Sequence, residues 1–277
     1  MGALDAFSGA FSLVAENKRV YLLVLVAMLI LSIPSFSSHH SNRIIVRERM
    51  SPNVIFEEYG TTSTLTDALI RELKASLLEM LMNLIVLSLV GYSAVKAYLL
   101  STGGEEYSLP ELITEALLRI PAVIVVNILA YLTALLTAAL PIGVIILGAV
   151  SSKAGIAFLG LFLLLATVPI LLTYFALVVP AYVESKSIGA FVDALGLTIK
   201  NLPTSLGYGI LVVLLTLGIS ILMTPLTLPL AKGGVNPALM ALIEAPFETF
   251  IVCFLWAGGV LLYKDLKVRG REEEFLY

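Results

Sequence analysis

Two carboxylic acids lie four residues apart in the last long apolar stretch of the chain. They are Glu244 and Glu248, and Pro246 lies between them. Residues four apart share a helix face, and ionisable groups inside a membrane span usually face a cavity or a partner. Because a proline also frees a backbone carbonyl, this pair can form an ion or substrate site. In the alternative interpretation, Pro246 marks the outer membrane surface and both carboxylates lie among lipid headgroups.

Three other polar side chains interrupt apolar stretches. Glu79 and Asn83 repeat the four-residue spacing near the start of an earlier stretch, where an interfacial position is the simpler interpretation. Asn127 shares a helix face with Tyr131, and hydrogen bonds between neighbouring helices explain both residues adequately. These three are therefore weaker intramembrane candidates than Glu244 and Glu248.

The sequence gives no support for enzymatic chemistry. The only histidines, His39 and His40, need further donors to bind a metal, and we expect a solvated pair in a loop. The single cysteine, Cys253, can form neither an intrachain disulfide nor a cysteine-based zinc site. The chain also lacks a His-Glu-x-x-His pair, a glycine-rich phosphate loop and a serine-nucleophile elbow. We therefore expect no enzyme, no metal site and no cofactor.

The composition indicates a membrane protein. Of 277 residues, 59% are hydrophobic and only 13% are charged, whereas a soluble domain carries about 25% charged residues. Several apolar runs approach the roughly 20 residues that a helix needs to cross a bilayer, and unbroken runs favour helices over a β-barrel. The net charge of −3 indicates no nucleic-acid partner, and the absence of glutamine is typical of a thermophilic prokaryote.

We predict an all-α integral membrane helical bundle with six transmembrane helices. The one long hydrophilic segment, 37–75, should be external, ending in a helix that opens near Thr64. The positive-inside rule then puts both termini in the cytoplasm of a cell membrane, with a charged tail at 264–277. The spans are expected at about 20–36, 77–100, 121–150, 154–183, 206–230 and 237–263.

Amphipathic segments precede three of these spans, at 3–16, 109–120 and 184–201. Such helices can lie in the interface plane with their apolar faces toward lipid. Anchoring of the bundle is the plainer interpretation. In the functional interpretation, Lys186 and Lys200 contact the phosphates of lipid headgroups.

Two of these segments resemble each other. Residues 6–17 align with 190–201 without gaps, with five identities in twelve positions. We infer three units, at about 1–100, 105–183 and 184–266, each an interfacial helix followed by a two-helix hairpin. The alternative is a chance likeness, because alanine and leucine are abundant in this chain. The identical pairs are Ala6 and Ala190, Phe7 and Phe191, Ala10 and Ala194, Leu13 and Leu197, and Asn17 and Asn201.

Two stretches carry a family resemblance: LVVPAYVESKSIGAFVDALGLTIKN at 177–201 and GGVLLYKDLKVRGREE at 258–273. Together they resemble the membrane domain fused to some glycerophosphodiester phosphodiesterases, and its stand-alone bacterial and archaeal relatives of unknown function. The resemblance implies a membrane module without the soluble, metal-binding catalytic barrel of those enzymes. The residues that match the pattern are Glu184, Ala194, Asn201, Tyr263, Asp265, Leu266 and Arg269.

Two functional hypotheses follow from the sequence. The first is a non-enzymatic membrane module whose partners are membrane lipids, a partner protein or further copies of the chain. The second is a transporter or channel that uses the acidic pair in the last span. Lipid retention supports the first hypothesis, and solute flux by the protein alone supports the second.

Overall fold

The computed structural model describes residues 2–32, 62–232 and 237–274, and all regular structure in these residues is helical. Five helices among them are long and apolar enough to cross a membrane, as expected of a multi-pass membrane protein. Residues 18–32 form a further helix, and the rest of the first predicted span, with His39 and His40, lies outside the described residues. The other helices are α1 (Ala3–Glu16), α3 (Thr62–Thr102), α4 (Leu109–Val150), α5 (Ala154–Ser185), α6 (Ala190–Lys200), α7 (Leu202–Lys232) and α8 (Pro237–Glu274).

Some helix boundaries differ from the predicted ones. Residues 109–120 do not form a separate amphipathic helix, because α4 continues through Pro121 without a break. Pro121 removes one backbone hydrogen bond of α4, and the burial of Ala116 and Val123 on either side packs both halves of the helix into the core. Helix α3 begins at Thr62, two residues before the predicted start, and α8 continues through most of the charged tail.

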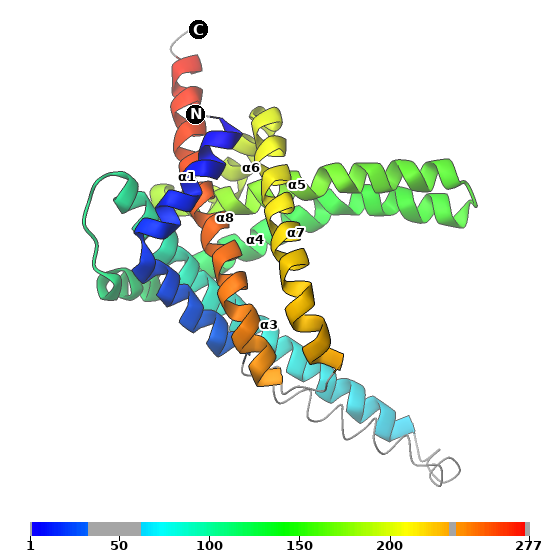
Figure 1. Ribbon diagram of the computed structural model, residues 1–277. Coiled ribbons are helices and arrows are strands. Elements are labelled where there is room, and N and C mark those ends of the chain that lie inside the picture. Colours follow the sequence, from blue (N-terminus) through cyan, green and yellow to red (C-terminus); the bar gives the residue numbers. More distant parts are fainter. Residues whose placement is uncertain (1, 33–61, 233–236, 275–277) are drawn as a thin grey trace.

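One connected core holds the molecule together, and we call this region the hub. It joins α1, α6, the starts of α4 and α7, and the C-terminal parts of α3, α5 and α8. The C-terminal half of α5 lies at its centre and packs against α3, α4, α6, α7 and α8. The start of α1 and the end of α8 lie close together at the top of Figure 1.

Two helical hairpins extend from the hub in different directions (Figure 1). The α4–α5 hairpin is closely packed along its length. A Cβ atom on Gly148 would lie 2.3 Å from the backbone nitrogen of Ala157, and one on Gly160 would lie 2.6 Å from that of Ile145. Glycine therefore allows the two backbones to touch. Helices α7 and α8 contact each other much less than α4 and α5 do.

Helices α1 and α6 have the same local structure, as their sequence likeness suggests. Asn17 and Asn201 follow their last residues, and each donates its backbone N–H to a leucine carbonyl four residues earlier, at 3.2 Å in both cases. Their side-chain amides donate to the same carbonyls, at 2.8 and 3.1 Å. The next helix starts at the following residue in each case. The division of the whole chain into three units stays a prediction.

Candidate functional site

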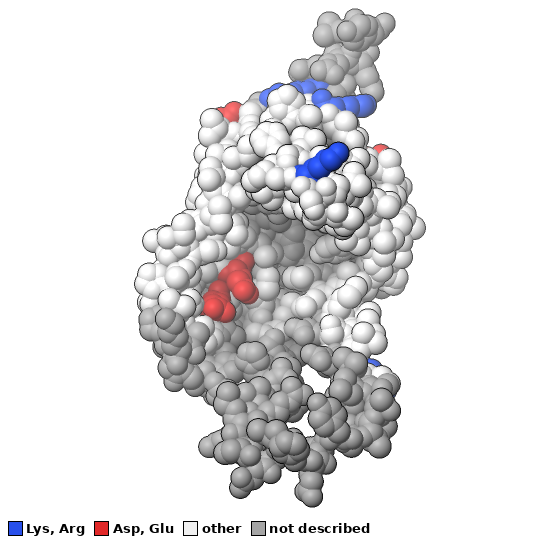
Figure 2. Space-filling model, turned by 90° about the vertical axis from the view of Figure 1, so that its right-hand side faces the viewer, with Lys and Arg blue, Asp and Glu red and all other residues white. Residues whose placement is uncertain are grey.

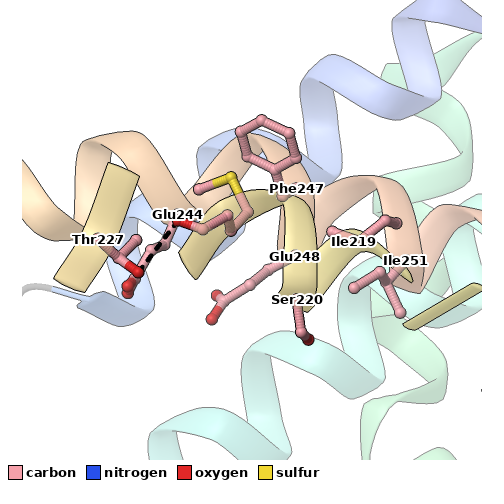
Figure 3. A pocket seen from close by; sticks show the side chains of 8 residues that line it. Ile219, Ser220, Thr227, Glu244, Phe247, Glu248 and Ile251 are labelled. Atoms are coloured by element: carbon pink, nitrogen blue, oxygen red, sulfur yellow. Dashed lines mark hydrogen bonds between the residues drawn. The ribbon is translucent and has the colours of Figure 1, made fainter. Parts of the chain in front are cut away.

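Glu244 and Glu248 line a groove between α7 and α8. Its volume is about 230 Å³, and both carboxylates lie among apolar side chains and two hydroxyl groups (Figure 3). On the face shown in Figure 2, a pair of acidic side chains lies in a hollow of otherwise uncharged surface, as expected for these two residues. The lining residues are Ile219, Ser220, Met223 and Thr227 from α7, and Glu244, Phe247, Glu248 and Ile251 from α8.

The hydroxyl groups of α7 are satisfied by their own helix. Ser220 donates to the carbonyl of Thr216 at 2.9 Å, and Thr227 donates to that of Met223 at 3.2 Å, the dashed line in Figure 3. Their oxygen lone pairs therefore remain available to a ligand. With two carboxylates opposite, the groove offers acceptors and suits a cation or a hydrogen-bond donor.

The position of the acidic pair suits both an intramembrane site and a place among lipid headgroups. The candidate span of α8 is Leu242–Arg269, so Glu244 lies at its start and Glu248 lies one turn deeper. The carbonyl of Pro246 accepts a hydrogen bond of 2.8 Å from the Tyr21 hydroxyl. None of the ion pairs among the described residues involves Glu244 or Glu248. Nothing described in the chain neutralises these two acids.

A different carboxylate is bound tightly in the hub. Glu115, in the second turn of α4, accepts a hydrogen bond of 2.7 Å from the Tyr92 hydroxyl. Its other oxygen forms an ion pair with Lys96. Tyr92 and Lys96 lie one turn apart on α3, so a single helix face supplies both donors. We call this arrangement a tyrosine–lysine clamp.

A second clamp closes on Glu184, near the end of α5. Tyr263 donates its hydroxyl to the carboxylate at 2.8 Å, and Lys267 forms an ion pair with it. The Lys267 ammonium also lies 5.8 Å from the centre of the Tyr263 ring. Glu184 and Tyr263 both belong to the stretches that carry the family resemblance, and the structure joins those stretches through this contact.

The same tyrosine–lysine spacing occurs a third time, at the end of α5. Tyr182 and Lys186 are four residues apart, as are the pairs at 92 and 96 and at 263 and 267. The Tyr182 hydroxyl is buried and has no hydrogen-bond partner among the described residues. Sequence reasoning missed both clamps, although the tyrosine–lysine spacing repeated at the ends of three spans was a readable signal.

A third polar cluster fixes the end of α1. The buried Asn17 donates its amide to the Ser101 hydroxyl at 3.2 Å and accepts a hydrogen bond of 2.7 Å from Tyr107. Burial raises the pKa of Tyr107 above its ordinary value, and the nearby positive charge of Arg19 opposes this rise. These neutral, satisfied groups lock α1 onto the end of α3 and offer no reactive chemistry.

The weaker candidates lie on α3 and α4. Asn127 donates its amide to the Ser88 hydroxyl at 2.9 Å, a hydrogen bond between the neighbouring helices α4 and α3. Tyr131 instead packs its ring against Phe175. Asn83 is half-buried on α3, and the side chain of Glu79 lies outside what the structure describes. Asn83, Asn127 and Tyr131 do not line the acidic groove.

The remaining candidates are surface cations. Lys186 follows the last residue of α5, Lys200 is the last residue of α6, and both are exposed. Among the described residues, no three histidine, cysteine, aspartate or glutamate side chains gather as a metal site would require. No family model, curated protein or solved structure matches the chain in the comparisons with known proteins.

Proposed function

We propose that this multi-pass membrane protein is a non-enzymatic module that binds membrane lipid through its interfacial helices. Both termini lie in the cytoplasm in this proposal, and α1 and α6 rest in the cytoplasmic interface of the bilayer. The resemblance to the membrane domain of glycerophosphodiester phosphodiesterases is part of the same proposal. A partner protein or further copies of the chain are the other partners that the sequence allows.

The observation that carries the proposal is the exposed apolar surface of α1 and α6. Their faces toward the hub contain small residues, namely Ala6 and Ala10 in α1 and Ala190 and Ala194 in α6, and α1 also buries Leu13 and Val14. Other large apolar side chains point outward, with Leu4 69% and Ile199 60% exposed. In water these exposed side chains gain no favourable free energy of burial. At a membrane interface the same side chains enter the acyl region, where their burial is favourable.

Native mass spectrometry of protein released from mild detergent tests the proposal. We expect the wild type to retain phospholipid. The α6 double variant Val192→Ser with Ile199→Ser should retain clearly less, because it removes two exposed apolar side chains and leaves the buried alanines unchanged. The matched control is Asp193→Ser with Gly196→Ser, which alters the same helix without removing apolar surface.

Two results would contradict the proposal. One is wild-type protein that retains no lipid when it is released from the detergent. The other is equal lipid retention by the apolar double variant and its control, at unchanged thermal stability. The second result would show that lipid is held elsewhere on the protein.

The acidic groove favours a second candidate function, transport of a cation or a cationic solute. One cavity of the α7–α8 hairpin contains two carboxylates and two hydroxyl groups. The carboxylates form no ion pair among the described residues. If the protein transports, liposomes containing it should show solute flux, and Glu244→Gln or Glu248→Gln should reduce that flux. Unchanged flux in both variants would remove the groove from consideration.

A further inference from the structure

The groove between α7 and α8 changes from polar to apolar along its length. Figure 3 shows Thr227 and Glu244 at one end of the groove and Ile219 and Ile251 at the other. The sequence agrees with this order, because Thr227 is near the end of α7 and Glu244 is near the start of α8. Glu244 and Ile251 are seven positions apart on α8, which corresponds to about 10 Å of helix. One ligand can therefore contact both ends of the groove.

The polar end of the groove offers hydrogen-bond acceptors. Ser220 and Thr227 donate their hydroxyl protons to carbonyls of α7, so each hydroxyl can only accept from a ligand. Glu244 and Glu248 also accept when they are ionised. The described residues that line the groove include no lysine, arginine or histidine. A ligand that neutralises this end needs positive charge and hydrogen-bond donors, and a protonated amine supplies both through its N–H groups.

The apolar end distinguishes this ligand from a bare metal ion. An ion such as Ca²⁺ takes six to eight oxygen ligands. The described residues bring no three histidine, cysteine, aspartate or glutamate side chains together. Half of the groove lining instead favours an apolar group, because burial of apolar surface there is favourable. These apolar lining residues are Ile219, Met223, Phe247 and Ile251.

The size of the groove limits the length of the apolar group. A dry cavity of about 150 Å³ can hold benzene, which has six carbon atoms. The groove, at about 230 Å³, is half as large again and has room for roughly nine atoms of that size. A phosphatidylethanolamine headgroup also carries an ammonium, but its phosphate would lie close to two carboxylates without a cation in the described lining. The groove therefore suits an amine that carries a short apolar chain and no anion.

We propose that the α7–α8 groove binds a protonated alkylamine. The ammonium lies between Glu244 and Glu248, and the chain extends toward Ile219 and Ile251. The inference deepens the second candidate function, because it names the class of cationic solute, and it rests on that function for the choice of site. Binding is measured without flux, so a failure to transport and a failure to bind are separate results.

Titration of the purified protein in a non-ionic detergent tests this site. Native mass spectrometry and the rise in unfolding temperature both report binding, and hexylammonium is the test ligand. Methylammonium has the charge without the chain, hexanol has the chain without the charge, and hexyltrimethylammonium has both but no N–H donor. We expect hexylammonium to bind about tenfold more tightly than each of these three, because each lacks one feature that the groove recognises.

Two variants of the acidic pair test the polar end. Glu244→Gln and Glu248→Gln should each weaken hexylammonium binding about tenfold, because each removes a charged acceptor. The matched control is Glu106→Gln, which removes an exposed acid between α3 and α4. This control should leave the affinity within about twofold of the wild type.

One variant of α7 tests the apolar end. Ile219→Ser should weaken hexylammonium binding about fivefold and leave the weaker binding of methylammonium unchanged, because it removes only apolar contact. The matched control is Ile221→Ser, which removes an isoleucine that is 69% exposed and does not line the groove. It should leave the affinity for both amines unchanged.

Four results would overturn the inference. Equal binding of hexanol and hexylammonium would show that the charge is not recognised, and equal binding of methylammonium or Ca²⁺ would indicate a site for a small cation. Tighter binding of phosphatidylethanolamine than of hexylammonium, with the same loss in Glu248→Gln, would assign the groove to a lipid headgroup. An equal loss of affinity in Glu106→Gln and in both groove variants would place the amine elsewhere. Binding with the expected pattern but without flux in liposomes would support the inference and contradict transport.

Discussion

The α4–α5 and α7–α8 hairpins have similar lengths, but they pack in opposite ways. Helices α4 and α5 touch backbone to backbone at Gly148 and Gly160. Helices α7 and α8 separate around a groove that contains two carboxylates and two hydroxyl groups. In the first hairpin, the acids lie only at the hub end, where tyrosine–lysine clamps hold Glu115 and Glu184.

This difference separates a hairpin that is fixed by close packing from a hairpin that keeps polar groups available to a ligand. A hairpin without acidic groups along its length can close completely, and small residues then set the distance between its helices. A hairpin that carries Glu244 and Glu248 would bury unpaired charge if it closed, and burial of unpaired charge is strongly unfavourable. The open α7–α8 groove is therefore the physical consequence of its acids.

The largest expected effect comes from enlarging a glycine in the closed hairpin. Gly148→Leu should destabilise the protein by about 3 kcal/mol, because even a Cβ at this position meets the α5 backbone at 2.3 Å. Gly143→Leu, five residues earlier on the same helix, has open space around its Cβ and should be neutral or slightly stabilising. Thermal unfolding in detergent measures both. Equal losses in the two variants would mean that α4 and α5 do not touch at Gly148.

Removing carboxylates should have opposite results in the two regions. Glu115→Gln should cost about 1–2 kcal/mol, because it leaves the half-buried Lys96 without its counter-charge and weakens the bond from Tyr92. Glu248→Gln should cost nothing or stabilise, because it removes a charge that has no ion pair among the described residues. The two variants can be compared by their unfolding temperatures at neutral pH. A larger loss in Glu248→Gln would show that the groove acid has a structural partner.

The sequence predicted the helices better than it predicted their contacts. Apolar run lengths and turn residues located α5 and α7, and the spacing of Glu244 and Glu248 indicated a shared face. Ser220 and Thr227, on the other side of the groove, could not be assigned to it because hydropathy does not give the order of helices in a bundle. Glu184 is 79 positions from Tyr263, so their contact depends on that same missing order. The continuity of α4 through Pro121 was also unpredictable, because local signals marked a break that packing overrides.

The smallest expected effect concerns hydroxyl groups that pack differently near the two hairpins. Ser88 receives the amide of Asn127 across the α3–α4 contact, whereas Ser220 bonds only within α7. Ser88→Ala should therefore cost about 0.6 kcal/mol, a common value for one hydrogen bond between membrane helices, and Ser220→Ala should leave stability unchanged. Unfolding curves for the two alanine variants in the same detergent provide the measurement. A larger loss of stability in Ser220→Ala than in Ser88→Ala would contradict the prediction. It would mean that the hydroxyl groups of the groove stabilise the α7–α8 hairpin, so that the two hairpins would not differ in this respect.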